Sequence, residues 1–173
     1  PPLPGTPPHS TSWVSRCTAH RVPYGPFFLP GARWPHALGM TQKYSIIHDL
    51  PYFFDPELLN EGVHKGKFHK DMPARFGIIP RFGRSEDVRW FEAKPAWVMH
   101  LANCYEEGDW VVQDACSWPE LVKPPIGGGT DGIYARLKRN VDITAAGAHM
   151  YRWLVNMVTG EVRGFPLDHE ATG

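Results

Sequence analysis

The chain has 173 residues, which is long enough for one ordinary domain with a hydrophobic core. Hydrophobic residues make up 42% and charged residues 21%, so the composition is that of a globular protein and excludes a disordered chain or a coiled coil. The net charge of zero leaves no electrostatic reason to expect binding to nucleic acid. The 17 glycines and 18 prolines predict many turns and short elements rather than long helices.

The cysteines and the two ends of the chain bear on its location. Cys17, Cys104 and Cys116 are an odd number without C-x-x-C spacing. This pattern fits neither a disulfide framework nor a zinc ribbon, and it favours a reducing, cytoplasmic location. Neither a run of 18 apolar residues nor a signal-peptide pattern occurs, so no membrane-spanning helix is expected. The chain begins at Pro1 without a methionine and ends without an obvious final element, so we expect a fragment.

Short strands separated by turn residues are predicted along most of the chain. Residues 1–20 are a proline-rich N-terminal stretch of undetermined structure, with a weak strand over 13–22, and 21–173 form the domain. A helical turn is predicted over 55–57 and a flexible loop over 123–132. Strands are predicted at 44–47, 63–70, 75–80, 88–92, 96–105, 110–116, 133–138, 150–158 and 162–167. The fold class is therefore all-β, and the pattern leaves a sandwich, a barrel and a propeller open.

Two histidines are candidate metal ligands. His36 follows Pro35, whose fixed φ limits local freedom, and a rigid segment suits a ligand. His100 lies between apolar residues, which predicts a buried or half-buried imidazole in its neutral, metal-binding form. From the residues alone, a solvated loop histidine at position 36 and a core histidine at position 100 are the commoner alternatives. His48 is assigned no site role, and His69 is predicted to lie on a solvated strand.

Three ordered blocks resemble the carotenoid cleavage oxygenase family. The segment HLANCYEEGD, residues 100–109, resembles the family signature H-x-x-N-A-Y-E-E-G-D. The segment PHALGMTQKYSIIHDLPYFFDPELL, residues 35–59, resembles the preceding histidine motif, and KDMPARFGIIPRFG, residues 70–83, resembles the stretch D-x-P-x-R-F-G-V-x-P-R. The resemblance covers roughly residue 20 to the C-terminus. The sequence of these blocks is most similar to that of the bacterial lignostilbene-dioxygenase-like branch. At two positions, Ala37 and Cys104, the sequence differs from the residues that members of the family usually have.

The resemblance implies a seven-bladed β-propeller with one Fe(II) on its axis, held by four histidines that three glutamates help to orient. His36 and His100 are the matching ligands, so the chain would supply about two blades and half of the ligand set. No catalytic residue beyond these ligands and no cofactor-binding residue is assigned. The implied partners are O2, a hydrophobic polyene or stilbene substrate and the remaining segments of the same protein, with peripheral membrane contact as a further expectation.

The resemblance also implies the reaction. A non-haem Fe(II)-dependent dioxygenase would cleave a C=C double bond of a carotenoid, apocarotenoid or stilbene-type substrate and give two carbonyl products. The alternative of another class is a catalytically inactive propeller fragment that acts as a binding or structural module, because half a ligand set cannot hold iron tightly. A hydrolase or isomerase on the same scaffold is a third alternative.

Overall fold

The computed structural model describes residues 29, 33, 35–54, 66–118 and 148–167. Within these residues the regular structure consists of ten strands and one short 3-10 turn, Ser85–Asp87. The all-β prediction is therefore confirmed. The predicted N-terminal stretch 1–20, the helical turn at 55–57, the loop at 123–132 and the strands at 13–22 and 133–138 lie outside the described residues. No helix among the described residues is long and apolar enough to span a membrane.

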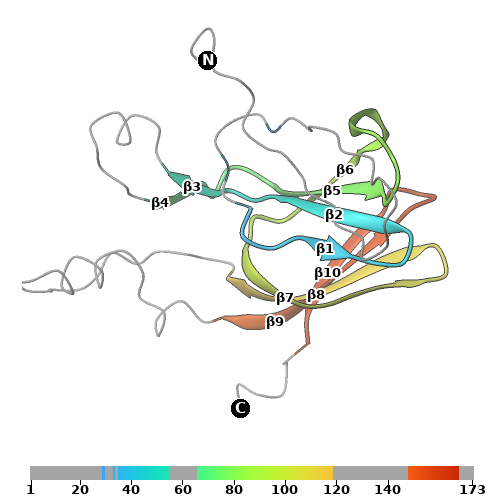
Figure 1. Ribbon diagram of the computed structural model, residues 1–173. Helices are drawn as coiled ribbons and strands as arrows, with labels where there is room; N and C mark the ends of the chain where they lie inside the picture. Colours follow the sequence, from blue (N-terminus) through green and yellow to red (C-terminus); the bar gives the residue numbers. More distant parts are fainter. Residues whose placement is uncertain (1–28, 30–32, 34, 55–65, 119–147, 168–173) are drawn as a thin grey trace, which may run out of the picture.

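The strands form two four-stranded antiparallel sheets that lie one above the other (Figure 1). The first sheet contains β1 (Gly39–Met40), β2 (Tyr44–Asp49), β5 (Ala74–Pro80) and β6 (Arg89–Ala93), in that spatial order. The second contains β7 (Trp97–Glu107), β8 (Trp110–Trp118), β9 (His149–Asn156) and β10 (Val162–Pro166). In each sheet the spatial order equals the chain order, as in a propeller blade that is built from its innermost strand outward.

The two sheets share one hydrophobic core. Phe76, Ile46 and Ile78 of the first sheet are almost fully buried against Val111 and Trp153 of the second. A small cavity remains between them, lined by Ile46, Phe76, Ile78, Val111, Gln113, Trp153 and Val155. Burial of such large side chains accounts for most of the attraction between the sheets, because removing apolar surface from water is the dominant stabilising effect. The first strands β1 and β7 are in contact, and so are the last strands β6 and β10.

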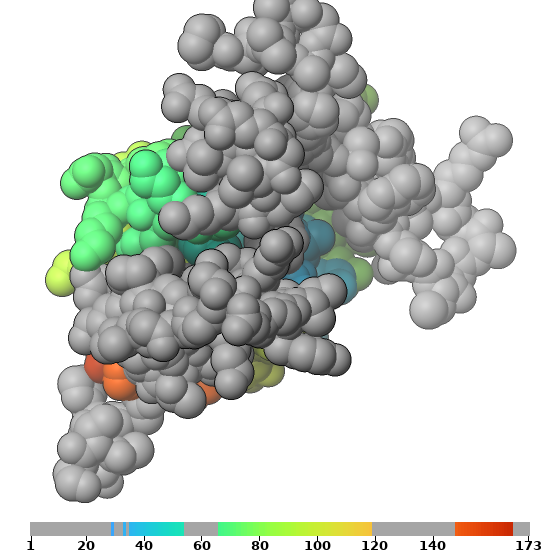
Figure 2. Space-filling view, turned by 90° about the vertical axis from the view of Figure 1, so that its left-hand side faces the viewer, coloured from blue at the N-terminus to red at the C-terminus, as the bar shows by residue number. Residues whose placement is uncertain are grey.

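Two short strands form a ribbon that leaves the first sheet between β2 and β5. Strand β3 (Tyr52–Phe54) pairs with β4 (Gly66–Phe68), and the pair projects beyond the end of β2 (Figure 1). On the face shown in Figure 2, green atoms that follow β4 in the chain and orange atoms of the β9–β10 region reach the surface at separate places.

The predicted strands within the described residues are confirmed to within a few residues at their ends. The structure adds β1 and β3, which were not predicted, because strands of two or three residues are too short to show a period of two. Strand β7 continues to Glu107, two residues beyond the predicted end at 105. Gly108 then makes the turn with a φ of 57°, a conformation that other residues rarely adopt.

Candidate functional site

His36 lies in the irregular segment that leads into β1, the first strand of the first sheet. Its side chain is exposed in the described structure. The backbone three residues later, at Gly39, is tightly packed. A Cβ added to Gly39 would come within 2.9 Å of Ile46 Cδ1 and 3.0 Å of Cys104 Sγ. Glycine at this position therefore lets β1 approach the neighbouring strands on both sides. This close approach places His36 beside the second sheet.

His100 lies on β7, the first strand of the second sheet, within the first of two irregularities in strand pairing. Three residue steps on β7 from Val98 to Leu101 match two steps on β8, and two steps from Leu101 to Asn103 match one. Each irregularity inserts one extra residue, which is the definition of a β-bulge. The prediction that His100 is buried or half-buried is wrong: its side chain is exposed. The bulges interrupt the alternation on which that prediction depended, and they turn the side chain away from the core.

The structure brings the two predicted ligands together. The ring centroids of His36 and His100 are 5.2 Å apart, and the ring planes make an angle of 51°. A bond from a metal ion to an imidazole nitrogen is about 2.1 Å long, so two rings on one ion at angles of about 90–109° have centroids roughly 4.6–5.3 Å apart. The pair therefore fits a shared ion in spacing. Imidazole nitrogen is also a suitable donor for iron.

The pair is not a complete metal site. Within the described ranges, no group of three or more His, Cys, Asp and Glu side chains is placed to hold a metal ion. Two exposed imidazoles leave the remaining coordination positions to donors from elsewhere. The geometry is that of a partial site at the edge of a two-sheet unit.

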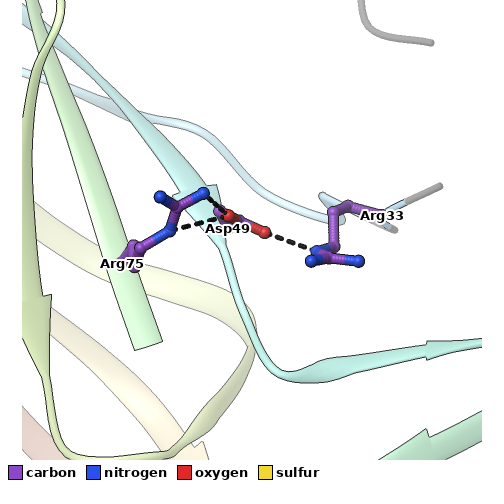
Figure 3. A network of polar contacts seen from close by, with 3 residues as sticks. All are labelled: Arg33, Asp49 and Arg75. Carbon is purple, nitrogen blue, oxygen red and sulfur yellow. Dashed lines mark hydrogen bonds and ion pairs between the residues drawn. The ribbon is translucent and has the colours of Figure 1, made fainter. Parts of the chain in front are cut away.

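A buried ion-pair network fixes the segment that precedes His36 (Figure 3). The Arg33 Nε–H donates to Asp49 Oδ1 at 2.7 Å, and the Arg75 guanidinium binds the other carboxylate oxygen of Asp49 through Nε at 2.9 Å and through its Nη2. Arg33 also lies over the ring of Phe53 at 4.1 Å. Asp49 is only 4% exposed, so two guanidinium groups are needed to offset the cost of burying its charge. The network joins β2, β5 and the His36 segment.

Cys104 is half-buried beside Gly39, and its thiol is a packing group here. Burial raises the pKa of the Cys104 thiol to about 11, so the thiol stays protonated at neutral pH. Both Cys104 and Cys116 are free cysteines. Cys17 lies outside the described residues. Cys104, which departs from the family pattern, therefore fills space between β7 and β1, the strand that follows the His36 segment.

Two further histidines have structural surroundings. His48 is 1% exposed, its Nε2 lies 2.8 Å from Gln113 Oε1, and its ring packs edge-on against Phe76. Burial lowers the pKa of His48 to about 4, so the ring is neutral and links β2 to β8. The prediction of a solvated strand at His69 is wrong, because His69 follows β4 and stacks on Phe53 with ring centroids 4.1 Å apart. Neither contact could be predicted from strand alternation.

Known proteins share both the sequence and the fold of this chain. The family model described as retinal pigment epithelial membrane protein, RPE65, matches residues 4–169. A carotenoid 9,10(9',10')-cleavage dioxygenase of Crocus sativus is 38% identical over 114 residues, which cover 64% of this chain and 21% of that protein. The chain thus spans about a fifth of that relative's length.

Two solved structures show the fold. The lignostilbene dioxygenase of Pseudomonas brassicacearum superposes with a TM-score of 0.59 and 24% identity, covering 81% of this chain and 28% of that one. A mutant of the Synechocystis apocarotenoid oxygenase superposes with a TM-score of 0.62 and 20% identity, covering 80% and 28%. The two sheets are therefore two neighbouring blades of a partial β-propeller. The chain belongs to the retinal pigment epithelial membrane protein family, the family of the carotenoid oxygenases.

Proposed function

We propose that this chain supplies two blades, and the iron ligands His36 and His100, to a non-haem Fe(II)-dependent dioxygenase. The observation that carries the proposal is the 5.2 Å separation of the two imidazole rings, which come from segments 64 positions apart in the sequence. Each ring belongs to the innermost part of its own blade, and such positions converge on the axis of a propeller. The other two histidines of the ligand set come from outside these two blades.

The proposed substrate is a carotenoid, an apocarotenoid or a stilbene-type compound. Names of related proteins support this choice, since they include a carotenoid cleavage dioxygenase and a lignostilbene dioxygenase. Leu38 and Met40, which are 50% and 56% exposed, provide apolar surface next to His36. An apolar polyene or stilbene loses little by leaving water for such surroundings. Both oxygen atoms of O2 are incorporated, and the C=C bond is replaced by two carbonyl groups.

When bound, the iron would bring O2 and the alkene together at its open coordination positions. The residues of this chain have a positioning role. The imidazoles of His36 and His100 would supply nitrogen ligands, the bulges of β7 set the direction of the His100 side chain, and the Arg33–Asp49 ion pair holds the segment before His36. Rigid placement matters because a ligand that is held by its surroundings loses little entropy when the metal binds.

The isolated 173-residue chain is expected to be inactive. Two exposed imidazoles give weak iron affinity, because tight binding needs the remaining ligands and a dry cavity. By itself, the chain would then have the alternative function, that of a binding or structural module. Metal content and O2 uptake of the chain, compared with those of the complete gene product that contains it, separate the two functions.

The test uses the complete gene product with His36→Ala and His100→Ala, and with His149→Ala as the matched control on β9. Iron content is measured after anaerobic loading with Fe(II), and aldehyde products are measured with a hydroxystilbene and an apocarotenoid. We expect each of the first two variants to lose at least tenfold in iron affinity and all detectable product, while the control keeps both. A full equivalent of iron in His36→Ala or His100→Ala would contradict the proposal.

A further inference from the structure

Glu106, near the end of β7, binds the turn between β1 and β2. Its Oε1 accepts hydrogen bonds from the Thr41 hydroxyl at 2.7 Å and from the Lys43 backbone N–H at 2.7 Å. Its Oε2 forms an ion pair with Lys43 Nζ at 3.0 Å. The β1–β2 and β7–β8 turns lie at the same end of the two sheets (Figure 1). One carboxylate thus joins the first strand of one blade to the first strand of the next.

The turn that Glu106 binds is itself closed by Thr41. The Thr41 N–H donates to the Tyr44 carbonyl oxygen at 2.9 Å, and the Thr41 hydroxyl oxygen accepts from the Tyr44 N–H at 3.0 Å. Thr41 is only 7% exposed. Its hydroxyl therefore has one role in closing the turn and another in donating to Glu106. A turn held from inside and from the neighbouring blade is a rigid attachment point.

The charge of Glu106 is retained in this position. Its side chain is 14% exposed, and although burial acts to raise the pKa of Glu106, the hydrogen bonds from Thr41 and Lys43 lower it below its usual range. The ion pair with Lys43 has a minor part, because the Lys43 side chain is 71% exposed and exposed ion pairs contribute little. The two hydrogen bonds to Oε1 therefore carry the contact.

The position of this contact relative to the histidines gives it a consequence for the site. Thr41 follows His36 by five positions and Glu106 follows His100 by six, so the carboxylate joins the two segments that carry the rings. We infer that Glu106 is a positioning residue for the metal site, because it fixes β1 against β7 and thereby fixes His36 relative to His100. The inference rests on the proposed function. It assigns Glu106 no contact with metal or substrate.

The test uses the complete gene product loaded with Co(II), whose visible absorption reports the geometry of its ligands, and Fe(II) affinity as a second measurement. Glu106→Ala removes both hydrogen bonds, and we expect about a tenfold loss of metal affinity with a shifted Co(II) spectrum. Glu106→Gln keeps an oxygen acceptor for both donors, so it should stay within about twofold of wild type. Lys43→Ala is the matched control, because it removes the ion pair but keeps the backbone N–H.

Several results would overturn the inference. Wild-type affinity and spectrum in Glu106→Ala would show that the contact does not position the site. Equal losses in Glu106→Ala, Glu106→Gln and Lys43→Ala would show that charge matters instead of position. If Glu106→Ala does not fold, Thr41→Val, which removes the donor to Glu106 together with the acceptor of the Tyr44 N–H, must produce a spectral shift, and Thr41→Ser, which keeps both, must not. His36→Ala and His100→Ala are measured in parallel: retained metal in them overturns the proposed function, whereas their loss with an unchanged Glu106→Ala overturns only the role of Glu106.

Discussion

Acidification should weaken the packing of the two blades through His48. The ring is buried between β2 and β8 and hydrogen-bonded to Gln113, and its pKa is lowered to about 4 from an ordinary value near 6.5. The unfolded chain therefore binds this proton more readily than the folded chain does. The stabilisation from the neutral ring is fully present above about pH 6.5, and it is lost progressively as the pH falls toward 4.

The pKa difference sets the size of the effect. Each pKa unit corresponds to about 1.4 kcal/mol, so the complete loss below pH 4 is about 3 kcal/mol. Between about pH 7.5 and pH 5, a single group with these two pKa values lowers the free energy of unfolding by about 2 kcal/mol. A loss of that size is a large part of the stability of an ordinary domain.

The assay is urea denaturation followed by tryptophan fluorescence over this pH range, on wild type and on His48→Gln. Glutamine does not titrate, so between about pH 7.5 and pH 5 the free energy of unfolding of the variant should fall by about 2 kcal/mol less than that of wild type. The stability of the variant at neutral pH is also reduced. Comparing how steeply the free energy of unfolding depends on pH in the two proteins removes the contribution of the other titrating groups. Equal pH-dependent losses in wild type and His48→Gln would refute the reasoning, as would an NMR titration that shows His48 protonating near pH 6.5.

Two further substitutions test the surroundings of the site. Asp49→Ala should lower the free energy of unfolding by about 3 kcal/mol, because it leaves the guanidinium groups of Arg33 and Arg75 without their carboxylate in a largely buried place; urea denaturation measures the loss, and a loss below about 1 kcal/mol would contradict it. Gly108→Ala should cost about 1 kcal/mol because φ is positive there, although no atom would lie within 4 Å of the new Cβ. Gly108→Asn should cost less in the same assay, since asparagine adopts this conformation more readily, and equal costs would argue against the backbone explanation.

Strands that are bounded by turn residues could be predicted from the sequence. Residues 75–80 are mostly apolar and precede the turn residues at 81–84, residues 110–116 follow the polar residues 106–109, and both segments are strands in the structure. The strands β1 and β3 could not be predicted in this way, because their place depends on long-range pairing with β2 and β4. Tertiary contacts, rather than local preference, determine whether such short segments become strands.

The candidate site depended on the family resemblance more than on local pattern. Nothing in the residues around His36 and His100 requires the two rings to meet, because their separation in the chain is bridged only by folding. The exposure of His100 was predicted wrongly, since bulges leave no reliable signal in a single sequence. Glu106 belongs to the recognised motif E-E-G-D. Its hydrogen bond with Thr41 could not be predicted from that motif, because the bond depends on how the two turns pack in the folded chain.

The two bulges of β7 allow the segment that carries His100 to vary in sequence separately from the residues that pair the strands of the blade. Together they insert an even number of residues, so the pairs Val98–Ser117 and Asn103–Asp114 on either side keep the faces that the sheet requires. The residues between these pairs are released from the constraint of alternation. Substitutions at the exposed positions His100 and Ala102 can therefore change the surface of the blade without repacking its core, whereas Met99 and Leu101 beside them pack against that core.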